Sequence, residues 1–388
     1  MNSPSLRVLF VFADGTPTEA HRAAVTVIGA LPHADVEPVA CFLGDGPLAA
    51  ACRDDLGVET FALAASVRSG RVTGRRARRA IERVMRTPHP DLVHSIGAVA
   101  HTVAGRAAKS VRAPAVWTQW DTATFRSGPQ LWAALAPART VFAASRIAEA
   151  CQQRVNPRRT RVILLPPGVA ASAEPREVRW ARARKVLGLE PDHLVVGWIA
   201  GPDPVAEAKV ALRAAASVCH ARPSARLVVV EDPGTPTPGL ERALRPLAAQ
   251  LGIERRLTFG ANATGARPSP TLDGLDLAIY VPRRPRATAL APLEALAAGV
   301  PLVAADVEPI REYVTPGLDG VLVLPGDHEV FAVALLALGD APEIRQQLSA
   351  AAEATVRERF AVAELTQRLA ATYRELLGGP VAEPAVPS

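Results

Sequence analysis

Short apolar runs alternate along the chain with longer segments in which apolar residues recur at helical spacing. The first run, LRVLFVF at residues 6–12, precedes a helical pattern over residues 19–31. Runs of four to six nearly all apolar residues, separated by helices, are typical of parallel strands that are buried on both faces of a sheet. The pattern therefore predicts an α/β protein.

Two such series follow one another. The first contains VEPVACFL, PDLVHSIG, APAVWTQWD and TVFAAS, and the second contains HLVVGWIAG, SARLVVVED, RRLTFGA, LDLAIYV, VPLVAAD and GVLVLP, with helices expected at 209–220 and 240–251. A polar segment at 170–192 separates them as a linker that leads into a helix. This order predicts two doubly wound, Rossmann-like domains facing a cleft, with a boundary near residue 172.

The end of the chain reads as one more helix and a tail. FAVAELTQRLAATYRELL, residues 360–377, has helical spacing and is followed by two glycines. The remaining PVAEPAVPS, residues 380–388, is predicted to be disordered.

Composition fits a folded protein, with 49% hydrophobic and 21% charged residues. Four cysteines lie far apart without a CxxC pair or a histidine at ligand spacing, which argues against a zinc site or a disulfide framework. The apolar run at residues 8–13 is too short for a membrane span and predicts a buried first strand. We therefore expect a cytoplasmic protein.

The charge of +6 comes from an arginine-rich composition, because only three of the 44 basic residues are lysine. We interpret this as a solvated surface and expect no nucleic-acid partner. Residues 71–86, RVTGRRARRAIERVMR, carry seven arginines and one acid and predict a helix. Two alternatives stay open for it: a solvated face, or weak contact with anionic lipid at the inner face of the membrane.

One segment carries a family resemblance. PLEALAAGVPLVAADVEPIREYVTPGLDGVLVLPGD, residues 292–327, resembles the retaining GT-B glycosyltransferases of family 4, also called group 1, which use nucleotide sugars. Residues 43–58, 90–108 and 360–377 resemble the same family more weakly, in the same order.

The resemblance implies a GT-B fold that binds the acceptor on domain 1–172 and the nucleotide sugar on domain 173–362. A terminal helix at 363–379 is expected to cross back to the first domain. The family needs neither a cofactor nor a metal ion, and no DxD cluster flanked by strands stands out. The acceptor is a small molecule, a glycan or a lipid-linked group.

Glu294 matches the second acid of the family's E-x7-E motif, which binds the ribose hydroxyls. With Pro292 at the first helical position, Glu294 is expected in the first turn, where a carboxylate is favoured. The alternative is that Glu294 caps its own helix. The resemblance also implies that backbone N–H groups near Thr288, Ala289 and Leu290 hold the diphosphate.

The chain departs from the family around this acid. Arg286 stands where the family has the first glutamate of the motif, and Gly201 and Ala206 stand where it has an arginine and a lysine on the donor phosphates. Losing two such contacts weakens donor binding by about two to four decades.

Three cations are candidates for that role. We predict donor contacts from Arg284 and Arg286, within the cluster RRPR, and from Lys209, which follows Ala206 by one helical turn. The alternative is that the arginines are solvated on a loop.

The first domain offers further candidates. Trp120 and Asp121 lie where many relatives present a histidine, so Asp121 and His101 are catalytic candidates and Trp120 is an acceptor contact. Glu19 and Gly15 follow the first strand, where relatives approach the acceptor and the donor phosphates. The alternative for His101 is a satisfied structural histidine.

Two hypotheses of different class follow. The first is an active glycosyltransferase with altered donor chemistry, such as a donor whose anionic sugar pairs with Arg286. The second is a non-catalytic GT-B protein that serves as partner or activator of another glycosyltransferase. A sugar-nucleotide epimerase is a distant third, because its acid and base residues are not visible.

Overall fold

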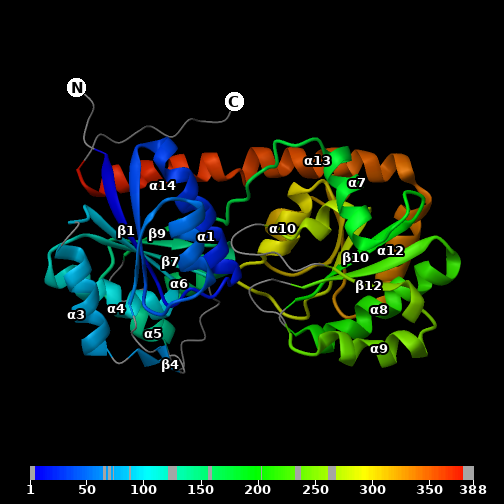
Figure 1. Cartoon of the computed structure of the whole chain (residues 1–388), viewed down its shortest axis with the longest axis horizontal. Coiled ribbons are helices and arrows are strands. Elements are labelled where there is room, and N and C mark those ends of the chain that lie inside the picture. Colours follow the sequence, from blue (N-terminus) through cyan, green and yellow to red (C-terminus); the bar gives the residue numbers. More distant parts are fainter. Residues whose placement is uncertain are drawn as a thin grey trace. The chain divides into compact units, whose positions relative to one another are not determined.

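A computed structural model describes residues 5–63, 67–68, 71–72, 74–86, 89–120, 129–155, 160–201, 203–231, 237–260 and 268–378. The chain divides into two compact units (Figure 1): Met1–Gly168 with Val362–Ser388, and Val169–Ala361. The sequence placed these boundaries at residues 172 and 362. The predicted tail at 380–388 lies outside the described residues.

The first unit is built on a seven-stranded sheet in the order β3-β2-β1-β6-β7-β8-β9. Its paired strands are parallel, and the strand order reverses between β1 and β6. The strands are β1 (Leu6–Phe12), β2 (Val36–Phe42), β3 (Glu59–Ala62), β6 (Leu92–Ile96), β7 (Ala115–Gln119), β8 (Thr140–Ala143) and β9 (Arg161–Leu164). A short hairpin, β4 (Val67–Arg68) and β5 (Arg71–Val72), precedes α3.

Helices bury both faces of this sheet. The apolar sides of α3 and α4 share one core cluster with Leu9 and Val11 of β1. Helix α14 packs on α1 and on the short helix η1, Leu31–Ala34, so the terminal helix crosses back to the first unit as the resemblance implied. The helices are α1 (Glu19–Ala30), α2 (Pro47–Ala50), α3 (Gly74–Arg86), α4 (Gly97–Ser110), α5 (Pro129–Ala134), α6 (Arg146–Arg154) and α14 (Val362–Leu376), and η2 (Ala51–Asp55) extends α2.

The second unit is built on a six-stranded parallel sheet in the order β12-β11-β10-β13-β14-β15, which reverses between β10 and β13. The strands are β10 (Leu194–Ile199), β11 (Ala225–Val230), β12 (Leu257–Phe259), β13 (Leu277–Tyr280), β14 (Leu302–Ala305) and β15 (Gly320–Val323). The helices are α7 (Arg176–Leu187), α8 (Pro204–Ala221), α9 (Leu240–Gln250), η3 (Glu254–Arg256), η4 (Pro270–Gly274), α10 (Leu290–Ala297), α11 (Ile310–Tyr313), α12 (His328–Asp340) and α13 (Pro342–Arg359).

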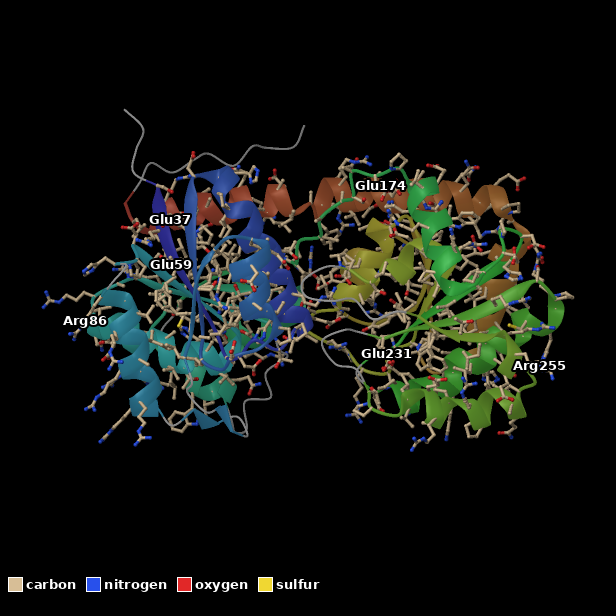
Figure 2. All side chains as sticks on the ribbon, viewed as in Figure 1. Glu37, Glu59, Arg86, Glu174, Glu231 and Arg255 are labelled. Atoms are coloured by element: carbon tan, nitrogen blue, oxygen red, sulfur yellow. The ribbon has the colours of Figure 1, made fainter. Side chains whose placement is uncertain are left out.

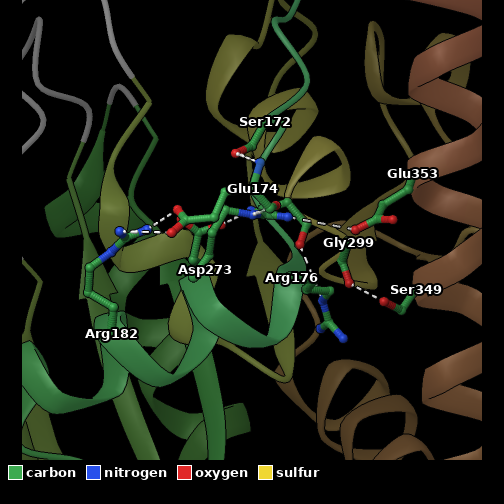
Figure 3. Close-up of polar contacts among 10 residues, drawn as sticks. Ser172, Glu174, Arg176, Arg182, Asp273, Gly299, Ser349 and Glu353 are labelled. Carbon is green, nitrogen blue, oxygen red and sulfur yellow. Dashed lines mark hydrogen bonds and ion pairs between the residues drawn. The ribbon is translucent and has the colours of Figure 1, made fainter.

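A polar network fastens α7 within this unit (Figure 3). Arg179 pairs with Asp273 of η4, and its guanidinium lies 3.9 Å from Glu353 of α13. The Ser349 hydroxyl donates to the Gly299 carbonyl at 2.6 Å. Because Arg179 is buried, its contacts with Asp273 and Glu353 hold α7 against both η4 and α13.

Two predicted helix starts are wrong. Helix α8 begins at Pro204, five residues before the expected 209, because Asp203 caps it with a hydrogen bond to the Ala206 amide. Helix α10 begins at Leu290, so Pro292 is its third residue and not its first. Among the residues that the structure describes, no helix combines the length and apolar character needed to cross a membrane.

Candidate functional site

The strand order of the second unit points to its site. Strands β10 and β13 are neighbours, with Trp198 opposite Ile279. The connection after β10 leads to β11 on one side, and the connection after β13 leads to β14 on the other side. In open α/β sheets, ligands bind outside the carboxyl ends of the strands at such a reversal. The candidate site is therefore formed by the loops after β10 and β13 and by the starts of α8 and α10.

The start of α10 is suited to an anion. Its N-cap is Ala289, whose methyl side chain cannot accept a hydrogen bond from the helix. Just before it, Thr288 is only 6% exposed, and its hydroxyl has no hydrogen-bond partner among the described residues. An uncapped helix start beside a buried hydroxyl presents donors toward a negatively charged group.

Glu294 lies on the same helix and is 5% exposed. Because α10 begins at Leu290, Glu294 falls in the second turn, which corrects the expected first-turn position. The alternative that Glu294 caps its own helix stays open. Glu294 is thus a buried carboxylate in the turn that follows the first turn of α10.

The predicted cations separate into two groups. Arg286 is half-buried; its Nη1 donates to the Tyr280 hydroxyl at 3.3 Å, and its backbone N–H donates to the Glu308 carbonyl at 2.9 Å. Arg284 and Lys209 are exposed. The structure therefore fixes Arg286 at the end of β13 and leaves the other two at the surface.

Sequence reasoning missed Glu207, in the first turn of α8. Its side chain is buried, and Oε2 accepts the Gly201 backbone N–H at 2.8 Å. A Cβ at residue 201 would lie 2.5 Å from that oxygen, so a larger residue there would have to displace the Glu207 carboxylate. Burial raises the pKa of Glu207 to about 6, while the positive charge of Arg286 acts to lower it. The signal in the sequence is the acid directly after Ala206, but the family resemblance implies a cation, and not an acid, in this part of the loop.

In the first unit, His101 is fully buried. Its ring stacks on Trp117 with centroids 5.0 Å apart, and its Nδ1 lies 2.7 Å from the Ser95 hydroxyl. Burial lowers the pKa of His101 to about 3 and keeps it neutral. This geometry favours the structural alternative over catalysis. Asp121, the other catalytic candidate, lies outside the described residues.

The remaining first-unit candidates lie near the reversal between β1 and β6. Gly15 packs against Gly46 so closely that a Cβ would lie 2.6 Å from the Gly46 nitrogen. Glu19 begins α1 and is buried. Trp120 lines a small, mostly apolar cavity between the sheet, α1 and α14, together with Phe10 and others. The roles of Glu19 and Trp120 toward the acceptor and of Gly15 toward the donor stay predictions.

The description "Glycosyl transferases group 1" belongs to the family model that matches residues 181–355. These residues lie entirely in the second unit and contain both α8 and α10. The match to the group 1 glycosyl transferases thus covers somewhat less than half of the chain. The described residues contain no cluster of three or more metal-ligating side chains.

Solved structures agree on the fold of the chain. Anabaena Alr3699/HepE, solved in complex with UDP-glucose, aligns with a TM-score of 0.78 at 19% identity, over 95% of this chain and 100% of that one. The sucrose-phosphate synthase of Thermosynechococcus elongatus aligns with a TM-score of 0.76 at 18% identity, over 96% and 99% of the two chains. The chain has the GT-B fold.

The most similar curated relatives include two D-inositol 3-phosphate glycosyltransferases. The one from Nocardia farcinica is 35% identical over 191 residues, which is 48% of this chain and 42% of the relative. The one from Thermobispora bispora is 35% identical over 223 residues, 56% of this chain and 51% of the relative. The chain thus spans about half the length of the curated relatives it matches.

Proposed function

We propose that the protein is a retaining glycosyltransferase that moves a hexosyl group from a nucleoside-diphosphate sugar to an acceptor. The donor binds to domain 173–362 and the acceptor to domain 1–172. The observation that carries the proposal is the position of buried Glu294 on α10, a helix whose N-cap is an alanine and which starts at the strand reversal of the family-matched unit.

Each part of that site has a role. Glu294 accepts hydrogen bonds from the two ribose hydroxyls. The N–H groups at Thr288, Ala289 and Leu290, with the Thr288 hydroxyl, donate to the diphosphate. Arg286 pairs with a phosphate or with an anionic group on the sugar, while Arg284 and Lys209 add a weaker, solvent-screened field.

The reaction needs little acid or base chemistry from the protein. As the bond between the sugar and the diphosphate breaks, negative charge develops on the leaving phosphate oxygen, and that oxygen takes the acceptor's proton. The protein contributes positioning and charge stabilisation through its helix start and Arg286. Asp121 remains a candidate for orienting the acceptor, and Glu19 and Trp120 for binding it; we place no metal ion in the reaction.

The acceptor is a small molecule, a glycan or a lipid-linked group. For a lipid-linked acceptor, the arginine face of α3 supplies weak contact with an anionic surface. Arg75, Arg76, Arg78, Arg79, Arg83 and Arg86 of this helix are all exposed, and Figure 2 shows Arg86 pointing away from the unit.

Calorimetric titration of the purified chain with UDP, GDP and TDP, each with and without magnesium, tests the donor site. We expect micromolar binding of one nucleotide. Glu294→Ala should weaken it by about two to four decades, because two hydrogen bonds to a charged group are lost. Glu254→Ala is the matched control. Glu254 is exposed and lies in η3, just before β12, which is an edge strand and does not neighbour β10 or β13.

The second candidate is the non-catalytic partner or activator. It is favoured by one observation, the absence of cations at Gly201 and Ala206. It predicts no binding of any of the three nucleotides and a stable complex with another glycosyltransferase. Turnover by the purified chain alone would eliminate it.

A further inference from the structure

The first unit contains a small cavity at its own strand reversal. Strands β1 and β6 are neighbours there, with Phe10 opposite His94, and both residues line the cavity. Ile96, which ends β6, and Trp120, which follows β7, line it too. Helices α1 and α14, which pack on each other (Figure 1), supply further walls. Ligands of open α/β sheets bind at such a reversal near the carboxyl ends of the strands, so the position of the cavity favours a binding site.

The walls of the cavity are mostly apolar and carry no charge. They come mainly from α1, from α14 and from residues 165–168 after β9. Of the described residues that line the cavity, His94 is the titratable one, and burial lowers its pKa to about 3, so its ring is neutral. The hydroxyls of Tyr373 and Thr118 occupy its two ring nitrogens, at 2.5 and 2.6 Å. A charged group in this space would find no counter-charge in the walls, which is unfavourable.

One polar group in the wall lacks a partner. Trp120 is 8% exposed, and its indole Nε1 is buried without a hydrogen-bond partner among the described residues. A buried N–H group that has no acceptor is unfavourable, because it has lost its hydrogen bond to water and gained none in return. An oxygen atom of a molecule bound in the cavity that Trp120 lines can supply the missing acceptor. The cavity therefore suits a ligand with an uncharged oxygen beside an apolar group.

The size of the cavity limits what enters it. Its volume is about 30 Å³, and it is partly open to the outside. A water molecule needs about 10–15 Å³ of such space, so the cavity has room for a group of about two heavy atoms, such as an ethyl group. The rest of a larger ligand stays outside. Each methylene group that enters apolar surroundings strengthens binding about fourfold, so the gain stops once the cavity is full.

We propose that this cavity holds a short, uncharged apolar group of the acceptor, next to an ether or hydroxyl oxygen that accepts the Trp120 indole N–H. The inference rests on the proposed glycosyl transfer and narrows the acceptor to a compound whose bound end is uncharged and apolar. A short alkyl glycoside has this chemistry, because its glycosidic oxygen adjoins the alkyl group. The hydroxyls of its sugar stay outside the cavity, where one of them receives the transferred sugar. An acceptor that enters with a phosphorylated end does not fit the uncharged walls.

The test titrates methyl, ethyl, propyl and butyl glucosides, and ethyl phosphate as the charged counterpart, into the full chain labelled with nitrogen-15 at tryptophan. NMR follows the indole N–H signals, and Trp120→Phe identifies the signal of Trp120. Ala24→Val fills the cavity, because Ala24 of α1 lines it and is 6% exposed. Ala20→Val, on the same helix but outside the lining, is the matched control.

We expect the affinity of the unsubstituted chain to rise about fourfold from the methyl to the ethyl glucoside and to change little from ethyl to butyl. The Trp120 indole signal should move downfield with these probes, because its N–H gains an acceptor, and should not move with ethyl phosphate. Ala24→Val should weaken binding of the ethyl glucoside about tenfold and remove the shift, since the ethyl carbons no longer fit. Ala20→Val should behave like the unsubstituted chain.

The outcomes separate this inference from the proposed function. No binding of any glucoside, or equal affinity along the alkyl series with an unmoved Trp120 signal, overturns the inference, and the unsubstituted chain alone decides this. Binding that a folded Ala24→Val retains in full, or a Trp120 signal that ethyl phosphate moves equally, also overturns it. Titration of the same protein with UDP, GDP and TDP reports separately on the donor site. Binding of one nucleotide without any glucoside removes the cavity inference only, whereas no nucleotide binding removes the proposed donor site.

Discussion

At the scale of single residues, Arg184 shows how the second unit uses a buried charge. It is 2% exposed and donates to the carbonyls of Gly274, Glu190, Pro191 and His193 and to the Asp276 carboxylate. Its guanidinium also lies 4.1 Å from the centre of the Trp180 ring. One planar guanidinium thus joins α7 to the segments that precede β10 and β13.

Replacing Arg184 should strongly destabilise the second unit. Arg184→Met leaves the Asp276 carboxylate and several carbonyls without their donor, at a cost of about 3–5 kcal/mol. Arg184→Lys keeps the charge but not the fork, so an intermediate loss is expected. Urea unfolding measures both. Arg182→Lys, at an exposed pair with Glu174, is the control and should change little.

The sequence could identify Glu294 but not Glu207. Glu294 lies within a segment whose residue types match a family motif, so its role could be inferred by position. Glu207 has its character from burial, from the bend toward Gly201 and from the nearness of Arg286. None of these is encoded in spacing along the chain. Contacts between neighbouring strand ends appear only once the sheet order is known.

At the scale of elements, helix starts were the least predictable feature. Pro292 was assigned to the first position of its helix, yet it lies third in α10. The first four N–H groups of a helix have no internal partner, so proline is tolerated anywhere in that turn. The polar residues before Lys209 similarly concealed the first turn of α8. Strands were easier, because nearly all their residues are apolar.

Helix α3 carries a prediction of its own. Its buried side contributes Ala77, Ile81, Val84 and Met85 to the core, while six arginines face outward. We expect weak co-sedimentation with vesicles that contain phosphatidylserine, and its loss at 0.5 M salt, because each arginine contributes at most about 1 kcal/mol near an anionic surface.

The matched variants for this test change charge on two helices. Arg75, Arg79 and Arg83 to Gln should abolish sedimentation, whereas Arg242 and Arg245 to Gln, on α9, should not. Sedimentation that is equal on neutral and anionic vesicles would show that the arginine face is simply solvated.

At the scale of the whole molecule, the two units differ in their response to acid. His94 and His101 are both buried in the first unit, and burial lowers the pKa of each to about 3. His94 is held between the hydroxyls of Tyr373 and Thr118, at 2.5 and 2.6 Å. Both rings are therefore neutral in the folded chain and become charged when it unfolds below about pH 6.5.

The sign of the effect follows from these depressed values. The stability from neutral burial is fully present above the unfolded pKa near 6.5 and is lost as pH falls toward 3, at up to about 1.4 kcal/mol per pH unit for each histidine. Hydrogen exchange of the full chain should show the first unit opening first between pH 6 and 4. His101→Phe should reduce that pH slope, whereas His220→Gln, at an exposed histidine of the second unit, should leave it unchanged.

The two-unit architecture could be predicted from the sequence, because alternating apolar strands and helices fix a doubly wound sheet in each half, and the resemblance of residues 292–327 implied the GT-B fold. The resemblance also implied that the diphosphate binds at the helix start near Thr288, which stays a prediction. The sequence could not predict the charge balance of the site, because Gly201, Glu207 and Arg286 are separated along the chain and are brought to one edge by the strand order.

The Glu207 carboxylate also bears on how the loop after β10 can change. Its Oε2 accepts the Gly201 amide at 2.8 Å, and a Cβ at residue 201 would lie 2.5 Å from that oxygen. An arginine placed at residue 201, where the family has one, would therefore have to displace the Glu207 side chain. Restoring the family pattern in this loop thus requires changing residues 201 and 207 together.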